Sequence, residues 1–202
     1  MASSIARPLL SVSNKSIFSV WGSAQPQDGP TPPKFDESGR LPAGLAAYRG
    51  AVDDLDDLVL NEDKMHAEAV DVHLETPLHI AATWGQLGIV RLLVRDHAVD
   101  VDPVNWEGWT PFFCAISRSH IEVADFLLSN GANLYHTTPS GMTAMHIAAW
   151  FAQRDSIEYL IQKRAPLHTE NVYGVTPIGM SRPGPIKRMM FNALEEADKD
   201  KD

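Results

Sequence analysis

The chain is poor in cysteine and in long apolar runs. Cys114 is the only cysteine among the 202 residues, so the chain can form neither an internal disulfide nor a cysteine-based zinc site. A single cysteine also fits a reducing compartment. No run approaches the roughly 18 apolar residues that a membrane-spanning helix needs, so we expect no membrane span.

Basic residues are scarce as well. Lys and Arg number 17 against 26 Asp and Glu, which gives a net charge of −9. Affinity for nucleic acid comes from cations that neutralise phosphates, so a nucleic-acid partner is not expected. Much of the acid lies between Asp53 and Glu75. We interpret it as a solvated acidic face, with a site for a basic partner as the alternative.

Acidic residues are also missing from the start of the chain, before Asp28. Residues 1–40 are rich in Ser, Pro and Gly, and this composition predicts a disordered leader and linker. An acid-free start is typical of organelle transit peptides too, although Arg7 and Lys15 are its only basic residues before that point. We predict a cytoplasmic or nuclear protein and keep chloroplast or mitochondrial targeting as the alternative.

What the chain does contain is a repeat. Similar strings recur along it: TPLHIAA from Thr76, TPFFCAI from Thr110, TAMHIAA from Thr143 and TPIGMS from Thr176. The intervals are 34, 33 and 33 residues, and a constant period of this size predicts stacked repeats. The predicted units are residues 41–75, which are degenerate, 76–109, 110–142, 143–175 and a partial unit at 176–182.

Each unit has the pattern of two short helices followed by a tight turn. Pro111 suits the first turn of a helix, where a missing N–H needs no partner, and Gly108 suits a turn that needs a positive φ. The second unit has one extra residue, which we place around residues 99–102, so its turn should bulge. Residues 183–202 are predicted to form a capping helix and a polar tail.

These units resemble the ankyrin repeat, whose T-P-L-H-x-A signature recurs every 33 residues. The resemblance covers about residues 41–182. It implies an all-α solenoid of about four to five helix–turn–helix units, with projecting β-turn fingers and a concave binding face. It also implies that His79 and His146 are structural. Phe113 and Gly179 depart from the pattern, since the family has His at both positions.

The resemblance also implies where a partner would bind. In the family, partners contact the fingers and the two residues that follow the Ala-Ala of each first helix. The corresponding residues here are Trp84, Trp106, Glu107, Trp109, Arg118, Met142, Trp150, Phe151 and Tyr173. Trp, Tyr and Arg are the types most enriched at binding hot spots. Alternatively, some of these rings pack between fingers or lie under the N-terminal segment, with Phe18–Trp21 as its plug.

No catalytic motif accompanies these residues. The sequence has no G-x-S-x-G, no Gly-rich phosphate loop and no H-E-x-x-H, and Cys114 is expected to be a buried apolar residue. We expect no enzyme activity, no cofactor and no metal. The predicted function is a non-catalytic scaffold (adaptor, inhibitor or regulatory subunit) that is monomeric on its own and binds another protein. The alternative is an organelle-targeted carrier or import factor with a cleaved leader.

Overall fold

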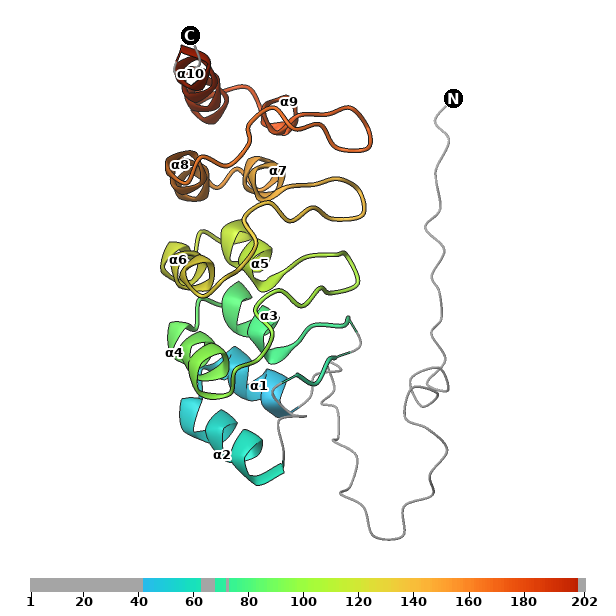
Figure 1. Cartoon of the computed structure of the whole chain (residues 1–202), viewed down its shortest axis with the longest axis vertical. Coiled ribbons are helices and arrows are strands. Elements are labelled where there is room, and N and C mark those ends of the chain that lie inside the picture. Colours follow the sequence, from blue (N-terminus) through green and yellow to red (C-terminus); the bar gives the residue numbers. More distant parts are fainter. Residues whose placement is uncertain (1–41, 63–67, 72, 200–202) are drawn as a thin grey trace. The chain divides into compact units, whose positions relative to one another are not determined.

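The computed structural model describes residues 42–199 except for 63–67 and 72. The predicted leader at residues 1–40, including the Phe18–Trp21 plug, lies outside the described residues. Within the described part, every regular element is a helix, and the helices form two columns (Figure 1). The predicted all-α stack of helix pairs is therefore confirmed.

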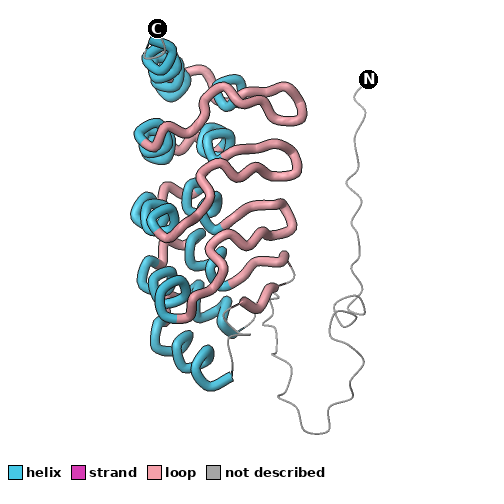
Figure 2. Tube along the Cα trace, viewed as in Figure 1, coloured by secondary structure: helices cyan, strands magenta, loops and turns pink. Residues whose placement is uncertain are grey.

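One column holds the first helix of each repeat and the other holds the second. The first helices are α1 (Pro42–Arg49), α3 (Pro77–Thr83), α5 (Pro111–Ser117), α7 (Ala144–Trp150) and α9 (Pro177–Met180). The second helices are α2 (Val52–Glu62), α4 (Leu87–Arg91) continued by the π-helical turn η2 (Leu92–Asp96), α6 (Ile121–Ser129), α8 (Arg154–Gln162) and α10 (Pro185–Lys199). The loops between repeats project to one side as fingers (Figure 2).

A threonine fixes the start of four first helices. The hydroxyl groups of Thr76, Thr110, Thr143 and Thr176 each accept a hydrogen bond from the main-chain N–H three residues later. This bond satisfies one of the N–H groups that a helix leaves unpaired at its start. Proline follows three of these threonines and needs no partner there. The repeated Thr-Pro pair is therefore the local signal that sets the period.

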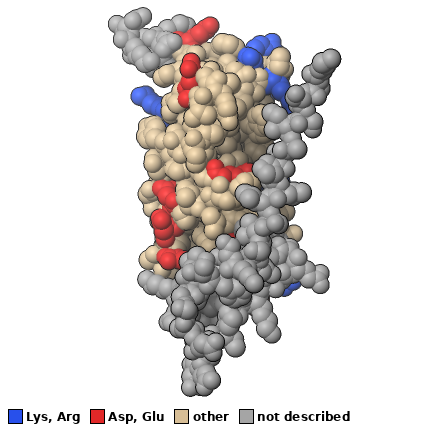
Figure 3. Space-filling model, turned by 90° about the vertical axis from the view of Figure 1, so that its right-hand side faces the viewer, with Lys and Arg blue, Asp and Glu red and all other residues tan. Residues whose placement is uncertain are grey.

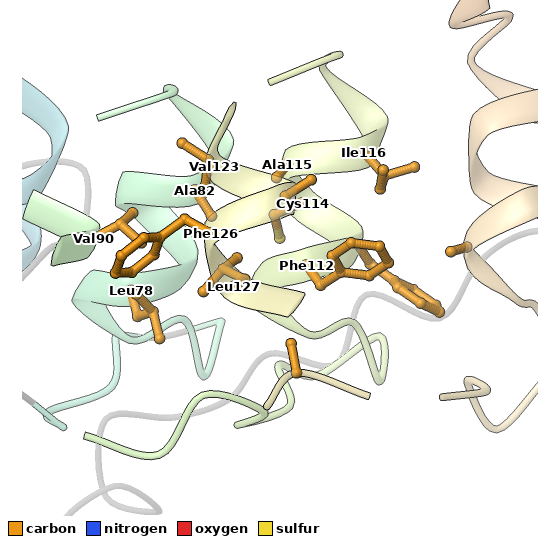
Figure 4. Packing of buried hydrophobic residues seen from close by; sticks show 14 of the residues in the cluster. Leu78, Ala82, Val90, Phe112, Cys114, Ala115, Ile116, Val123, Phe126 and Leu127 are labelled. Carbon is orange, nitrogen blue, oxygen red and sulfur yellow. The ribbon is translucent and has the colours of Figure 1, made fainter. Parts of the chain in front are cut away.

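The core runs between the two columns. Figure 4 shows Phe112 of α5 beside Leu127 of α6, and both side chains are fully buried, as is Ile116 of α5. Burying an apolar side chain of this size contributes about 1.5–3 kcal/mol. Cys114 belongs to the same core, and burial raises the pKa of its thiol to about 12. The cysteine is therefore an unreactive apolar residue, as predicted.

The extra residue of the second repeat lies in its second helix, so the predicted bulge of the finger is wrong. After α6, the N–H of Ala132 bonds to the carbonyl of Leu127, five residues earlier. In the second repeat, the N–H of Val99 bonds to Leu93, six residues earlier. The π-helical turn η2 takes up the additional residue, and Leu93 and Val99 both stay buried.

All the fingers close in the same way. In the second finger, the N–H of Asn105 bonds to the carbonyl of Trp109, and the N–H of Gly108 bonds to the carbonyl of Asn105. The Asn105 side chain accepts two more main-chain hydrogen bonds, from Glu107 and Trp109, at 3.0 Å each. Gly108 has a φ of 78°, which a residue without a Cβ adopts at little cost.

Candidate functional site

Seven of the nine predicted partner-binding residues are exposed. They are Trp84, Trp106, Glu107, Arg118, Trp150, Phe151 and Tyr173. The other two, Trp109 and Met142, are half-buried and pack against the hydrophobic core. We call the nine residues together the aromatic surface. It has two parts, one on the fingers and one at the ends of the first helices.

The finger part is formed by residues at the tips of the turns. Trp106 has 65% of its surface exposed and Tyr173 has 78%. The main chain beneath Trp106 is held by its N–H, which donates to the carbonyl of His73 in the preceding finger at 3.2 Å. The N–H of Tyr173 donates to the side chain of Asn171 at 2.9 Å. These rings therefore stand in solvent on a hydrogen-bonded backbone.

The helix-end part lies where the first helices terminate. Trp84, Arg118 and Phe151 are the C-cap residues of α3, α5 and α7. The ring of Trp84 meets that of Tyr48 edge to face, with centroids 4.8 Å apart. Such pairs stabilise one orientation of the rings. Three consecutive repeats thus present an exposed tryptophan, arginine and phenylalanine at the same position.

Trp109 joins the two parts and shows that one ring does pack within the molecule. Its ring meets that of Phe151 edge to face, with centroids 6.0 Å apart. Its carbonyl oxygen accepts hydrogen bonds from the N–H of Asn105 and from the imidazole of His79. The interpretation that rings pack inside the molecule therefore applies to Trp109, which both orients Phe151 and covers the core.

Two buried histidines hold the fingers against the first helices. The N–H of Thr76 donates to Nδ1 of His79, so the ring proton lies on Nε2, which donates to the carbonyl of Trp109 at 2.9 Å. In the fourth repeat, His146 makes the same bonds to Thr143 and to the carbonyl of Val175. Burial lowers the pKa of both imidazoles, so both are neutral.

The third repeat replaces this histidine with Phe113. The Phe113 side chain is fully buried, and its ring meets that of His136 edge to face with centroids 5.4 Å apart. Nε2 of His136 lies 2.9 Å from the carbonyl oxygen of Gly108 in the preceding finger. His136 therefore contacts the second finger, which His79 also holds, and Phe113 makes no such hydrogen bond to the third finger.

Another set of cross-links joins the end of each first helix to the next repeat. Gln86, His120 and Gln153, which precede the second helices, reach the carbonyl oxygens of Tyr48, Thr83 and Ser117 in the preceding repeats. These contacts hold the helix ends that carry the exposed residues. The signal in the sequence is the equal spacing of the three residues from the Thr that starts each repeat.

Charge differs between the two sides of the stack. Figure 3 shows the finger side, where most of the described surface is uncharged; acidic atoms lie in the middle, along the left edge and near the top, and basic atoms lie near the top. Charged pairs occur on or beside the second helices: Arg154 with Glu158 and Lys163 with Asp125, both at 2.8 Å. The acidic residues Asp53, Asp54 and Asp57 of α2 are exposed, as a solvated acidic face requires. Asp71 of the same acidic stretch is instead buried and accepts hydrogen bonds from the main-chain N–H groups of His73 and Glu75.

Three other features of the described residues bear on the kind of site they form: metal-binding groups, pockets and membrane spans. No group of three or more His, Cys, Asp or Glu among them is placed to hold a metal ion. Two open depressions of about 260 and 660 Å³ lie beside α10, away from the aromatic surface. In the same part of the chain, no helix is long and apolar enough to cross a bilayer. The site is therefore a surface and not a pocket.

Comparison with known proteins identifies the repeat. A family model described as ankyrin repeats (3 copies) matches residues 43–138 and 99–171. The chain is 33% identical over 115 residues to the ankyrin repeat and SAM domain-containing protein 6 of Rattus norvegicus, which covers 57% of this chain and 13% of that protein. It is 29% identical over 119 residues to the phosphate system positive regulatory protein PHO81 of Saccharomyces cerevisiae, covering 51% of this chain and 10% of that protein.

A third relative is the transient receptor potential cation channel subfamily A member 1 of Homo sapiens, which is 33% identical over 88 residues, or 43% of this chain and 8% of the channel. The match thus spans only a small part of each of these relatives, and their names describe much longer proteins. What all the matches share is the repeat itself. On the family model, the two columns of helices and the regular fingers, the chain belongs to the ankyrin-repeat family.

Proposed function

We propose that this chain is a non-catalytic scaffold that binds a partner protein on its aromatic surface, as an adaptor, inhibitor or regulatory subunit. Ankyrin repeats generally mediate binding between proteins. The yeast relative is, by its name, a regulatory protein. The finer role and the docking position are inferred from the surface of this chain.

The distribution of exposed aromatic rings carries this proposal. Five of the seven described aromatic residues with large exposed surfaces lie on the fingers or the ends of the first helices: Trp84, Trp106, Trp150, Phe151 and Tyr173. The other two are Tyr135 and Phe191. Each ring buries about 150–250 Å² when it is covered, and apolar area gathered on one surface of a water-soluble fold marks a binding site.

The backbone under these rings is fixed before a partner arrives. Asparagine side chains close the second and fourth fingers, His79 and His146 join fingers to helices, and residues such as Gln153 join each repeat to the next. A surface that is ordered beforehand loses less conformational entropy on association. The repeat architecture therefore supports tight binding by a few exposed rings.

The test removes exposed rings only. We expect the triple variant Trp106→Ala, Trp150→Ala, Tyr173→Ala to lose partner binding by about 100-fold or more, because hot-spot rings each contribute about 2 kcal/mol or more. The partner is first captured by the full chain from its native source, identified and purified. Its Kd is then measured for each variant by calorimetry, and helical circular dichroism and melting are recorded beside it.

The matched control is the double variant Tyr135→Ala, Phe191→Ala, which removes two exposed rings outside the aromatic surface. We expect it to bind as the unaltered chain does. Equal losses in the triple variant and the control, or a triple variant that no longer melts cooperatively, would overturn the proposal. Trp109 is left intact because its ring is half-buried and packs on the core.

We place the protein in the cytoplasm or nucleus, on the basis of one buried cysteine and no others. The alternative, an organelle-targeted carrier or import factor, depends on the composition of residues 1–40. The N-terminal residue of the protein isolated from its own cells decides between them. A mature chain that starts near residues 25–40 would support the organelle-targeted carrier or import factor. A chain that still begins at residue 1 would exclude that alternative.

A further inference from the structure

The ends of the first helices carry alternating basic and aromatic residues. Arg49 ends α1, and the C-cap residues of the next three first helices are Trp84, Arg118 and Phe151. All four are exposed. We call these four residues the cap row. A basic residue at a helix end is favoured by the helix dipole, but this does not explain the exposed rings beside it.

The two arginines of the cap row have no carboxylate partner among the described residues. No ion pair, side-chain hydrogen bond or ring contact of Arg49 or Arg118 occurs there. The Arg118 side chain is exposed, and the main-chain N–H groups at this cap bond to carbonyls of α5. Both guanidinium groups are therefore available to an outside acceptor.

Acidic residues near the second helices behave differently. Asp56 lies 3.1 Å from Nε2 of His97, Asp125 pairs with Lys163, and Glu158 pairs with Arg154. Several of the charges on that side are thus matched within the chain, while the positive charges of the cap row are not. The net charge of −9 favours a basic partner for the chain as a whole, but the local charge of the cap row favours an acidic one.

We propose that the cap row binds an acidic, apolar segment of a partner protein, with an Asp or Glu side chain on Arg118 and apolar side chains on Trp84 and Phe151. This inference rests on the proposed protein-binding function and specifies the chemistry of the partner. The guanidinium group of Arg118 offers paired N–H donors that match the two oxygens of a carboxylate.

The dimensions of the repeat set the spacing of the segment. Neighbouring packed helices lie about 8–10 Å apart, so Arg118 is about that far from each flanking ring along the stack. The segment therefore presents apolar, acidic and apolar side chains in that order, at intervals of about 10 Å. Edge-to-face contacts with Tyr48 and Trp109 hold the two flanking rings in place.

The test uses a random peptide library displayed on phage and selected on the full chain. We expect selected peptides to share an acidic residue between two apolar ones. The best peptide is then synthesised, and its affinity is measured for the unaltered chain and for Arg118→Glu. The variant should bind this peptide at least about tenfold more weakly, and a peptide with Lys in place of the acidic residue should recover the loss.

Arg188→Glu is the matched control, because Arg188 is exposed on α10 and undergoes the same change of charge. It should leave the affinity unaltered. Peptides that require Trp150 but bind Arg118→Glu as tightly as the unaltered chain would overturn the acidic-segment proposal and leave the protein-binding function standing. Peptides that are indifferent to both Trp150→Ala and Arg118→Glu would count against both.

Discussion

The third repeat differs from its two neighbours at the residue that holds the following finger against the first helix. In the second and fourth repeats, His79 and His146 tie a finger to the start of a helix through hydrogen bonds inside the core. In the third repeat, Phe113 fills the same position without a hydrogen bond to the third finger, and His136 contacts the second finger, which His79 also holds. The stack keeps its period across this change.

This difference shows that the family's histidine has two separable roles. It fills volume at the helix start, and it accepts a hydrogen bond from the threonine N–H while donating another to the finger. Phe113 fills the same volume but can neither accept nor donate these hydrogen bonds. Its repeat therefore depends on apolar packing where its neighbours depend on buried polar contacts, and substitutions should separate the two.

The largest effect is expected from removing the packing of the third repeat. Phe113→Ala leaves a cavity in the core and deprives His136 of its ring contact. We expect the free energy of unfolding to fall by about 3–5 kcal/mol, the usual range for a buried phenylalanine. Urea unfolding followed by circular dichroism measures it. Phe191→Ala, at an exposed ring, should change stability by less than about 0.5 kcal/mol.

A smaller effect is expected from giving the fourth repeat the side chain of the third. His146→Phe leaves the buried N–H of Thr143 without its imidazole acceptor. An unpaired buried group of this kind costs about 1–3 kcal/mol. Urea unfolding at pH 7.5 measures this loss. An unchanged stability would mean that volume alone matters at this position.

The same variant should also alter the pH dependence of stability. Burial lowers the pKa of His146 in the folded chain below its ordinary value of 6.5, so the unfolded chain binds more protons as the pH falls below 6.5. The contribution of His146 is therefore present above pH 6.5 and lost as the pH falls toward the lowered pKa. Between pH 7.5 and 5, His146→Phe should lose less stability than the unaltered chain, by up to about 1.4 kcal/mol per pH unit.

The sequence predicted the repeats because their signals are local. A threonine followed by proline starts a first helix, and glycine permits the turn of a finger, as Thr110, Pro111 and Gly108 do. The extra residue of the second repeat was misplaced because a helix can absorb it as a π-helical turn without moving its apolar side chains. No local pattern distinguishes that solution from a longer finger.

The candidate site was predicted less completely than the fold. The repeat position of a residue shows which surface it faces, and Trp106 and Tyr173 are exposed there as expected. It does not show how far a long side chain bends back onto its own core. Trp109 is half-buried for that reason. Whether Arg118 has a carboxylate partner is decided by residues of other repeats. Its lack of one among the described residues could therefore not be predicted from the sequence around it.

The smallest effect is expected where the fingers of the second and third repeats meet. The N–H of Trp106 bonds to the carbonyl of His73, and that of Val172 bonds to Ser140, which joins the first finger to the second and the third to the fourth. Pro139 occupies the corresponding position of the third finger and has no N–H. This junction therefore lacks the main-chain hydrogen bond that the other two have.

Pro139→Ala supplies the missing donor opposite the carbonyl of Glu107. The new hydrogen bond stabilises the fold by about 0.5–1.5 kcal/mol. Loss of the rigid proline ring raises the conformational entropy of the unfolded chain and destabilises the fold by about 0.4–1 kcal/mol. These terms nearly cancel, so the global stability should change by less than about 1 kcal/mol. Hydrogen exchange is the decisive measurement: the amide of residue 139 should be protected about as well as those of Trp106 and Val172. An unprotected amide at residue 139 would mean that the path of the backbone, and not the proline, prevents a hydrogen bond between the second and third fingers.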